Sequence, residues 1–130
     1  MSGIDLQQAI FDKLTAEPSI TNDIYDFVPS GVDGTYIVIG DIPIDDWSDK
    51  LVNGFEANPV IHVFGDVNCG RKEILDTQKI IFNTLHRQPL TIADHQWVDT
   101  NQSFSEVLRE PDGVSYHGVQ RMNILYRSTT

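Results

Sequence analysis

The apolar residues near the start of the chain recur at the spacing of a helix. Leu6, Ile10 and Leu14 lie four residues apart, so a helix over residues 4–16 would place them in one stripe. A wider stripe of the same kind runs over residues 71–88. Its apolar members are Ile74, Leu75, Ile81, Phe82 and Leu85. Because each such side chain contributes about 1.5–3 kcal/mol when fully buried, the second helix is expected to anchor the core against a sheet.

Between these two stripes the pattern changes to that of strands. Residues 35–39 and 60–64 are rich in β-branched and aromatic side chains, and much of the segment between them is polar. We therefore predict that these strands are the arms of a long hairpin with its tip near 43–55. Asn53-Gly54 within that tip is typical of a hairpin turn, because this pair readily adopts positive φ angles.

The C-terminal third predicts further antiparallel strands. They are expected over 90–92, 96–107 and 114–127, with turns at 93–95 and 110–113. This order of elements indicates an α+β fold in which helices pack on one face of an antiparallel sheet and a long β-hairpin projects from it. At 130 residues the whole chain is expected to form a single domain.

Charge is distributed unevenly along the chain, whose formal net charge is −10. Residues 1–66 hold twelve acidic side chains against two lysines, whereas residues 67–130 hold seven acidic and seven basic ones. A surface with this balance does not favour binding to DNA phosphates, which depends on Lys and Arg. The excess charge either keeps the protein soluble or forms an acidic surface that faces a basic partner or repels DNA. No stretch is apolar and long enough to predict a membrane span, so no membrane partner is expected.

The sequence lacks the patterns that indicate catalysis or metal binding. It has no glycine-rich phosphate loop, and its four histidines lack the spacing of a metal site. Residues 66–77 resemble a calcium loop only in part, since the glycine falls one position early and Thr77 replaces the required Glu. Cys69, the only cysteine, lies at a predicted helix start, which favours packing over nucleophilic chemistry. We therefore predict no catalytic residue, no metal and no cofactor, and we do not expect an enzyme.

Candidate residues for protein–protein contacts fall in three places. At the hairpin tip they are Asp45, Asp46, Trp47 and Lys50, at the start of the second helix Arg71 and Lys72, and at the last turn Arg109, Glu110 and Asp112. Trp47 in a polar tip is typical of an anchor for assembly, although it could also fold back onto its own hairpin. The cations at the helix start oppose the helix dipole, so they either contact an acidic partner or are ordinary surface charges.

Several of these segments resemble the tail-completion family of tailed phages and gene transfer agents. The most specific is Arg-Glu-Pro-Asp-Gly at 109–113, followed by His117-Gly118-Val119. The strand at 60–64, followed by Gly70-Arg71-Lys72-Glu73 and an amphipathic helix, is similar as well. The resemblance covers about residues 4–127.

This resemblance implies a structural virion protein. It would form a ring, with six copies expected, that caps the head-proximal end of a tail tube and ends its polymerisation. The expected partners are other copies of the chain, the tube protein and a head-side connector or stopper protein, and DNA would pass through the bore without specific binding. The expected location is the tail of the virion, reached from the host cytoplasm during assembly.

Two other functions remain open at the level of sequence. The first is a neighbouring head–tail connector or stopper, which would also be a small ring-forming protein. The second is a small ligand-binding domain, which requires a pocket with converging polar groups.

Overall fold

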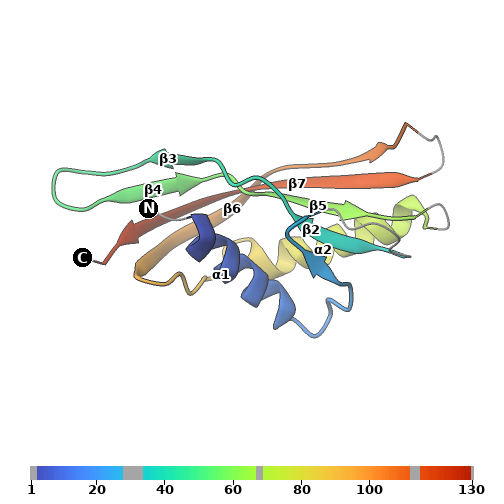
Figure 1. The fold of residues 1–130 in the computed structure, drawn as a ribbon, viewed down its shortest axis with the longest axis horizontal. Coiled ribbons are helices and arrows are strands. Elements are labelled where there is room, and N and C mark those ends of the chain that lie inside the picture. Colours follow the sequence, from blue (N-terminus) through green and yellow to red (C-terminus); the bar gives the residue numbers. More distant parts are fainter. Residues whose placement is uncertain (1–2, 28–33, 67–68, 112–114, 130) are drawn as a thin grey trace.

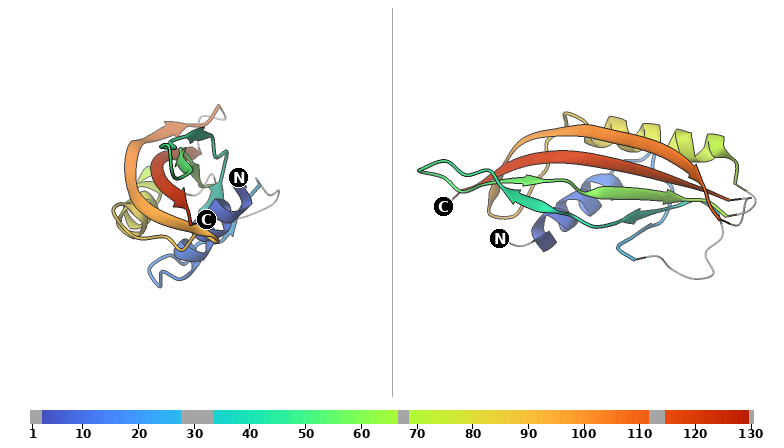
Figure 2. Two further views of the ribbon diagram at one scale, coloured as in Figure 1. Left: turned by 90° about the vertical axis from the view of Figure 1, so that its left-hand side faces the viewer. Right: turned by 90° about the horizontal axis from the view of Figure 1, so that it is seen from above.

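The structure, a computed structural model, describes residues 3–27, 34–66, 69–111 and 115–129. The two helices are α1 (Gly3–Thr15) and α2 (Arg71–Leu85). The strands are β1 (Ile24–Tyr25), β2 (Tyr36–Ile39), β3 (Ile44–Asp46), β4 (Gly54–Ala57), β5 (Val60–Phe64), β6 (His95–Arg109) and β7 (Tyr116–Ser128). All strand pairs are antiparallel except β1 with β2. Both helices lie on the same side of the curved sheet (Figures 1 and 2), which confirms the predicted α+β class.

Strand β7 is the centre of the sheet. Along one edge it pairs with β6, and along the other it pairs first with β5 and then with β4. Alternate residues of β7 are buried toward the helices, as the pleat of a strand requires. Among them Met122, Ile124 and Tyr126 are fully buried. The sheet face turned away from the helices carries the intervening, half-exposed residues.

The core lies between the helices and this sheet. Leu6, Ile10 and Leu14 of α1 are fully buried, as their spacing predicts. From α2, Ile81 and Leu85 reach the same cluster. The predicted stripe of α2 is wider than its buried face, because Leu75 is 45% exposed and Phe82 is only half-buried.

The segment between β2 and β5 folds back on itself. Strand β2 pairs with β5, and β3 pairs with β4. Because β4 also pairs with β7, this end of the segment extends the main sheet. The tip reaches one end of the molecule, opposite the end where β6 finishes and where β7 and α2 begin (Figure 1).

The turn at this tip differs from the prediction. Gly54 begins β4 and has no positive φ angle, so Asn53-Gly54 is not the turn. The chain reverses between Asp49 and Val52 instead, where the Asp49 amide donates to the Val52 carbonyl at 3.1 Å. The Asp49 carboxylate accepts hydrogen bonds at 2.8 Å from the amides of Leu51 and Val52, which lower the pKa of the Asp49 side chain. This carboxylate supplies the turn chemistry that the glycine was expected to provide.

The predicted strand over 90–92 is also wrong. Leu90 and Ile92 are buried, but this segment is irregular and joins α2 to β6. Arg87, with a φ angle of 60°, ends the helical course shortly after Leu85, so the helix stops before the predicted residue 88. The alternating apolar residues thus predicted the burial of Leu90 and Ile92 correctly, but the segment pairs with no strand among the described residues.

Candidate protein-interaction surfaces

Trp47 lies at the base of the hairpin tip, and its ring packs against Arg127 of the neighbouring strand β7. The guanidinium carbon of Arg127 lies 5.1 Å from the centre of the Trp47 ring, in a cation–π contact. The Trp47 amide donates to the Gly54 carbonyl at 2.8 Å, which fixes the backbone beneath the ring. The residue remains 37% exposed, so part of it is available to a partner.

The hairpin tip also exposes an apolar side chain that the sequence reasoning missed. Leu51 is 94% exposed and lies in the turn that Asp49 stabilises. Asp45, Asp46 and Lys50 are exposed as well. The signal that could have identified Leu51 is an apolar residue inside an otherwise polar turn. The hairpin therefore exposes an apolar side chain in its turn and carboxylates on β3, the strand that leads to it.

The other predicted residues lie at the opposite end of the molecule. Arg71 and Lys72 are exposed at the start of α2, and Lys72 pairs with Asp76 one turn later at 2.8 Å. Arg109 donates to the Tyr116 hydroxyl at 3.0 Å. Asp112 lies outside the described residues. The structure thus separates the predicted contact residues into two groups, one at each end.

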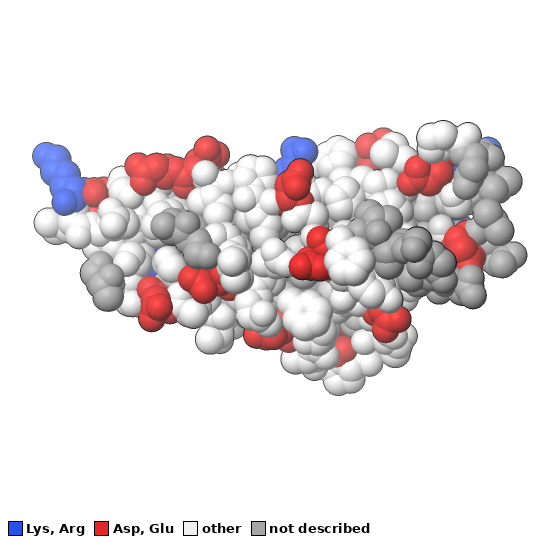
Figure 3. Space-filling model, in the orientation of Figure 1, with Lys and Arg blue, Asp and Glu red and all other residues white. Residues whose placement is uncertain are grey.

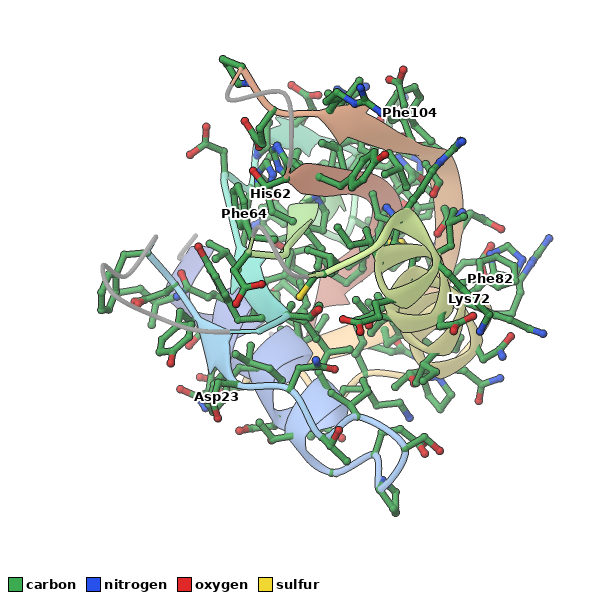
Figure 4. All side chains as sticks on the ribbon, turned by 90° about the vertical axis from the view of Figure 1, so that its right-hand side faces the viewer. Asp23, His62, Phe64, Lys72, Phe82 and Phe104 are labelled. Carbon is green, nitrogen blue, oxygen red and sulfur yellow. The ribbon has the colours of Figure 1, made fainter. Side chains whose placement is uncertain are left out.

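Glu110 belongs to a cluster of ionisable groups on the sheet face away from the helices. Its carboxylate lies 3.1 Å from Nδ1 of His117, and Nε2 of His117 lies 2.7 Å from Nδ1 of His62. The Phe64 ring stacks on His117, with the ring centres 4.1 Å apart. His62 and Phe64, both of β5, lie next to each other in Figure 4. Sequence reasoning missed this pairing because the two histidines are 55 positions apart.

Burial lowers the pKa of both histidines in this cluster. For His62 the charge of His117 lowers it further and Asp41 opposes the shift, and for His117 Glu110 opposes it. Both lowered pKa values favour neutral histidines at pH 7, and Nδ1 of a neutral His117 can donate a hydrogen bond to Glu110. No group of three or more potential ligands among the described residues could hold a metal ion.

A trough runs along α1, between this helix and the segment that includes β1. Its central part has a volume of about 470 Å³, and its lining mixes apolar and aromatic residues that include Ile4, Phe11 and Tyr25 with the polar Gln7 and Gln8. Ile4 is 75% exposed, although it lies on an otherwise well-packed helix. The full trough also has the acidic lining residues Asp23, Asp26 and Asp41. Acidic side chains are scattered over the face shown in Figure 3, and basic ones lie only at its margin.

The exposed face of α2 carries lysines and apolar side chains together with the carboxylates of Glu73 and Asp76. Lys72, Leu75, Lys79 and Phe82 form a stripe along this helix, which we call the α2 stripe. Leu75, Lys79 and Phe82 border a hollow of about 270 Å³ between α2 and β6. Lys72 and Phe82 point outward on the side of the molecule opposite Asp23 (Figure 4). The two helices therefore give the molecule an acidic side and a side with exposed lysines.

Neither helix is long and apolar enough to cross a membrane, within the part of the chain that the structure describes.

Comparisons with known proteins identify relatives of the whole chain. The family model described as tail completion protein gp17 matches residues 8–127. A chain in a solved structure, the virion of a native gene transfer agent particle, is 22% identical to this one, with a TM-score of 0.86. The similarity covers 95% of each chain and shows a shared fold. No curated protein matches the sequence.

Proposed function

The chain belongs to the tail completion protein gp17 family, and we propose on that basis that it forms a ring at the head-proximal end of a phage-type tail. The ring would end polymerisation of the tail tube and present a surface to the head-side connector. Six copies are the expected number. As a tail component the protein belongs to the virion, with a structural rather than a catalytic role.

The family match over residues 8–127 carries this proposal, because it spans all of α2, the larger part of α1 and all the strands up to residue 127 of β7. The exposed groups are of the kind that assembly requires. Large apolar side chains lie exposed at Leu51, Ile4 and Leu75, at three separate places on the surface. Scattered exposed apolar residues are ordinary in a monomer, but these three lie at a projecting tip, in a trough and beside a hollow.

The charge of the chain fits a channel through which DNA passes without binding. Each copy carries a formal charge of −10, so a ring of six would carry roughly −60. Acidic side chains facing a bore would repel DNA phosphates and keep the passage free. Assembly would then require screening of this charge, or pairing of it at the subunit contacts.

Tail assembly in the absence of the protein tests the proposal directly. Tails made without it should have tubes of variable, excess length and no attached heads, as seen by electron microscopy. Adding the purified protein should cap the tubes and restore the joining of tails to heads. Tubes of normal length that fail only to join heads would instead assign the protein to the neighbouring connector or stopper position. Normal, joined particles without the protein would contradict both functions.

A further inference from the structure

We propose that neighbouring copies in this ring meet through their helices, with the α2 stripe of one copy packed into the acidic trough along α1 of the next. This inference rests on the proposed ring and names the two surfaces that close it. The stripe consists of Lys72, Leu75, Lys79 and Phe82. The trough is lined by residues that include Ile4, Phe11 and Asp26.

The stripe has the shape of a helix ridge. Its members follow the spacing i, i+3, i+7, i+10, which places them on one face of α2. At 1.5 Å per residue this ridge is roughly 15 Å long, and α1, which forms one wall of the trough, is roughly 20 Å long. The ridge is therefore short enough to lie within the trough. Two apolar residues of the ridge, Leu75 and Phe82, would meet the exposed Ile4 and Phe11.

The charges of the two surfaces are complementary. Asp23, Asp26 and Asp41 line the trough, and none of its described lining residues is Lys or Arg. Lys79 borders the hollow beside α2, and Lys72 lies at the start of the ridge. The pair of Lys72 with Asp76 is exposed and contributes little to stability, so Lys72 can exchange this partner for a carboxylate of the trough.

The same charges exclude contact between two identical surfaces. Two troughs placed face to face would oppose carboxylates, and two stripes would oppose lysines. The contact must therefore join unlike surfaces, which makes it heterologous. Asp23 in the lining of the trough lies on the side of the molecule opposite Lys72 and Phe82 of the stripe (Figure 4). A heterologous contact between opposite sides can be repeated from copy to copy. The chain of copies closes into a ring where the rotation between neighbouring copies divides a full turn evenly.

Charge reversal on each surface gives a specific test. Lys79→Glu changes only the stripe, and Asp26→Lys changes only the trough. Each variant alone would oppose like charges at every contact, and we expect at least a tenfold weaker association. An equimolar mixture should recover the ring. When the two variants alternate, the stripe of Lys79→Glu places its glutamate against the lysine in the trough of Asp26→Lys. At the next contact the native Lys79 of one variant faces the native Asp26 of the other. The mass of the assembly is measured by native mass spectrometry, on the free protein or on capped tail ends where the free protein is a monomer.

Arg121→Glu is the matched control, since it makes the same change of charge as Lys79→Glu at an exposed position of β7, on the sheet face turned away from both helices. Its ring should form normally, and circular dichroism should show all three variants folded. If Lys79→Glu and Asp26→Lys each form rings as well as the unmodified protein, or if the mixture fails to recover, the helix contact is wrong. The proposed function survives that result, because a ring formed through other surfaces would still cap tails. A protein that forms no ring in solution or on tails contradicts the proposed function itself.

Discussion

Replacing Gly54 with alanine should destabilise the hairpin tip, because the structure leaves no room for a methyl group there. A Cβ atom at this position would press against the carbonyl oxygen of Trp47 and lie 2.9 Å from its carbonyl carbon. These backbone atoms cannot move away independently. The Trp47 amide donates to the Gly54 carbonyl at 2.8 Å, and the Gly54 amide donates to the Ser48 hydroxyl at 3.0 Å.

The expected cost follows from these contacts. Overpacking a tight site typically costs about 1–3 kcal/mol, and each hydrogen bond lost on relaxation adds about 1 kcal/mol. A net loss of about 2 kcal/mol would lower the melting temperature of a domain of this size by roughly 6–10 °C. The tip can instead open locally. The free energy of global unfolding then falls by less, and the amides of the tip exchange their hydrogens faster. Urea denaturation and hydrogen exchange of the Trp47 amide measure the two effects together.

Gly3→Ala is the matched control for this substitution. A Cβ atom at Gly3 would meet only Cδ1 of Ile44, at an ordinary 3.8 Å. Because Gly3 begins α1, where alanine is the better helix former, this variant should be neutral or more stable by up to about 1 kcal/mol. A Gly54→Ala protein with unchanged stability and unchanged protection of the Trp47 amide would refute the steric reasoning.

Three other predictions concern single groups. Trp47→Ala should leave the monomer folded but reduce its cosedimentation with tail tubes, since the indole ring packs on Arg127 and is partly exposed. Global unfolding of this variant would refute the assignment of Trp47 as a contact residue. The free energy of unfolding should fall as the pH drops below 6.5, the ordinary pKa of a histidine. Burial lowers the pKa of both His62 and His117, so below this pH the unfolded chain binds protons that the folded chain does not. Urea denaturation at pH 7.5 and 5.5 measures this loss, which should shrink in His62→Gln; an equal loss in that variant would exclude the pair as its source. Burial raises the pKa of the Cys69 thiol, so a thiol reagent at pH 7.5 should label the folded protein far more slowly than the urea-unfolded protein, and equal rates would contradict its buried placement.

Periodic apolar residues predicted the helices well, because a stripe that repeats at the helical period must face the core to be buried. Leu6, Ile10 and Leu14 illustrate this, since all three are fully buried. The same logic failed at Leu90 and Ile92. Alternation there indicated two buried side chains, but a strand also requires a neighbour with a free edge, and no local pattern specifies that neighbour.

Turn chemistry was harder to predict, because two residues competed to form the same turn. Asn53-Gly54 has the stronger local propensity for positive φ angles. The carboxylate of Asp49 nevertheless satisfies the amides of Leu51 and Val52, and the turn forms there. Gly54 is instead required by the close approach of the Trp47 backbone, a tertiary contact that single-residue propensities do not contain.

The interaction surfaces were only partly predictable for a related reason. The sequence identified exposed charges such as Lys72, but it assigned Leu75 and Phe82 to the core because they lie within the apolar stripe of α2. A helix packed against a curved sheet buries only part of such a stripe, and its remaining edge is left exposed. The pairing of His62 with His117 depends on the register of β5 with β7, which the sequence does not state.

The uneven charge along the chain becomes a spatial polarity because of the order of its elements. The acidic first half supplies α1, β1 and β2 together with the hairpin, while the balanced second half supplies α2, β6 and β7. Since β2 pairs with β5 and β6 pairs only with β7, the two halves occupy opposite edges of one sheet. A random mixture of charges would repel copies equally in every orientation. With the charge divided between two edges, contact between two acidic edges carries the strongest repulsion, so the fold itself disfavours copies that meet through this edge.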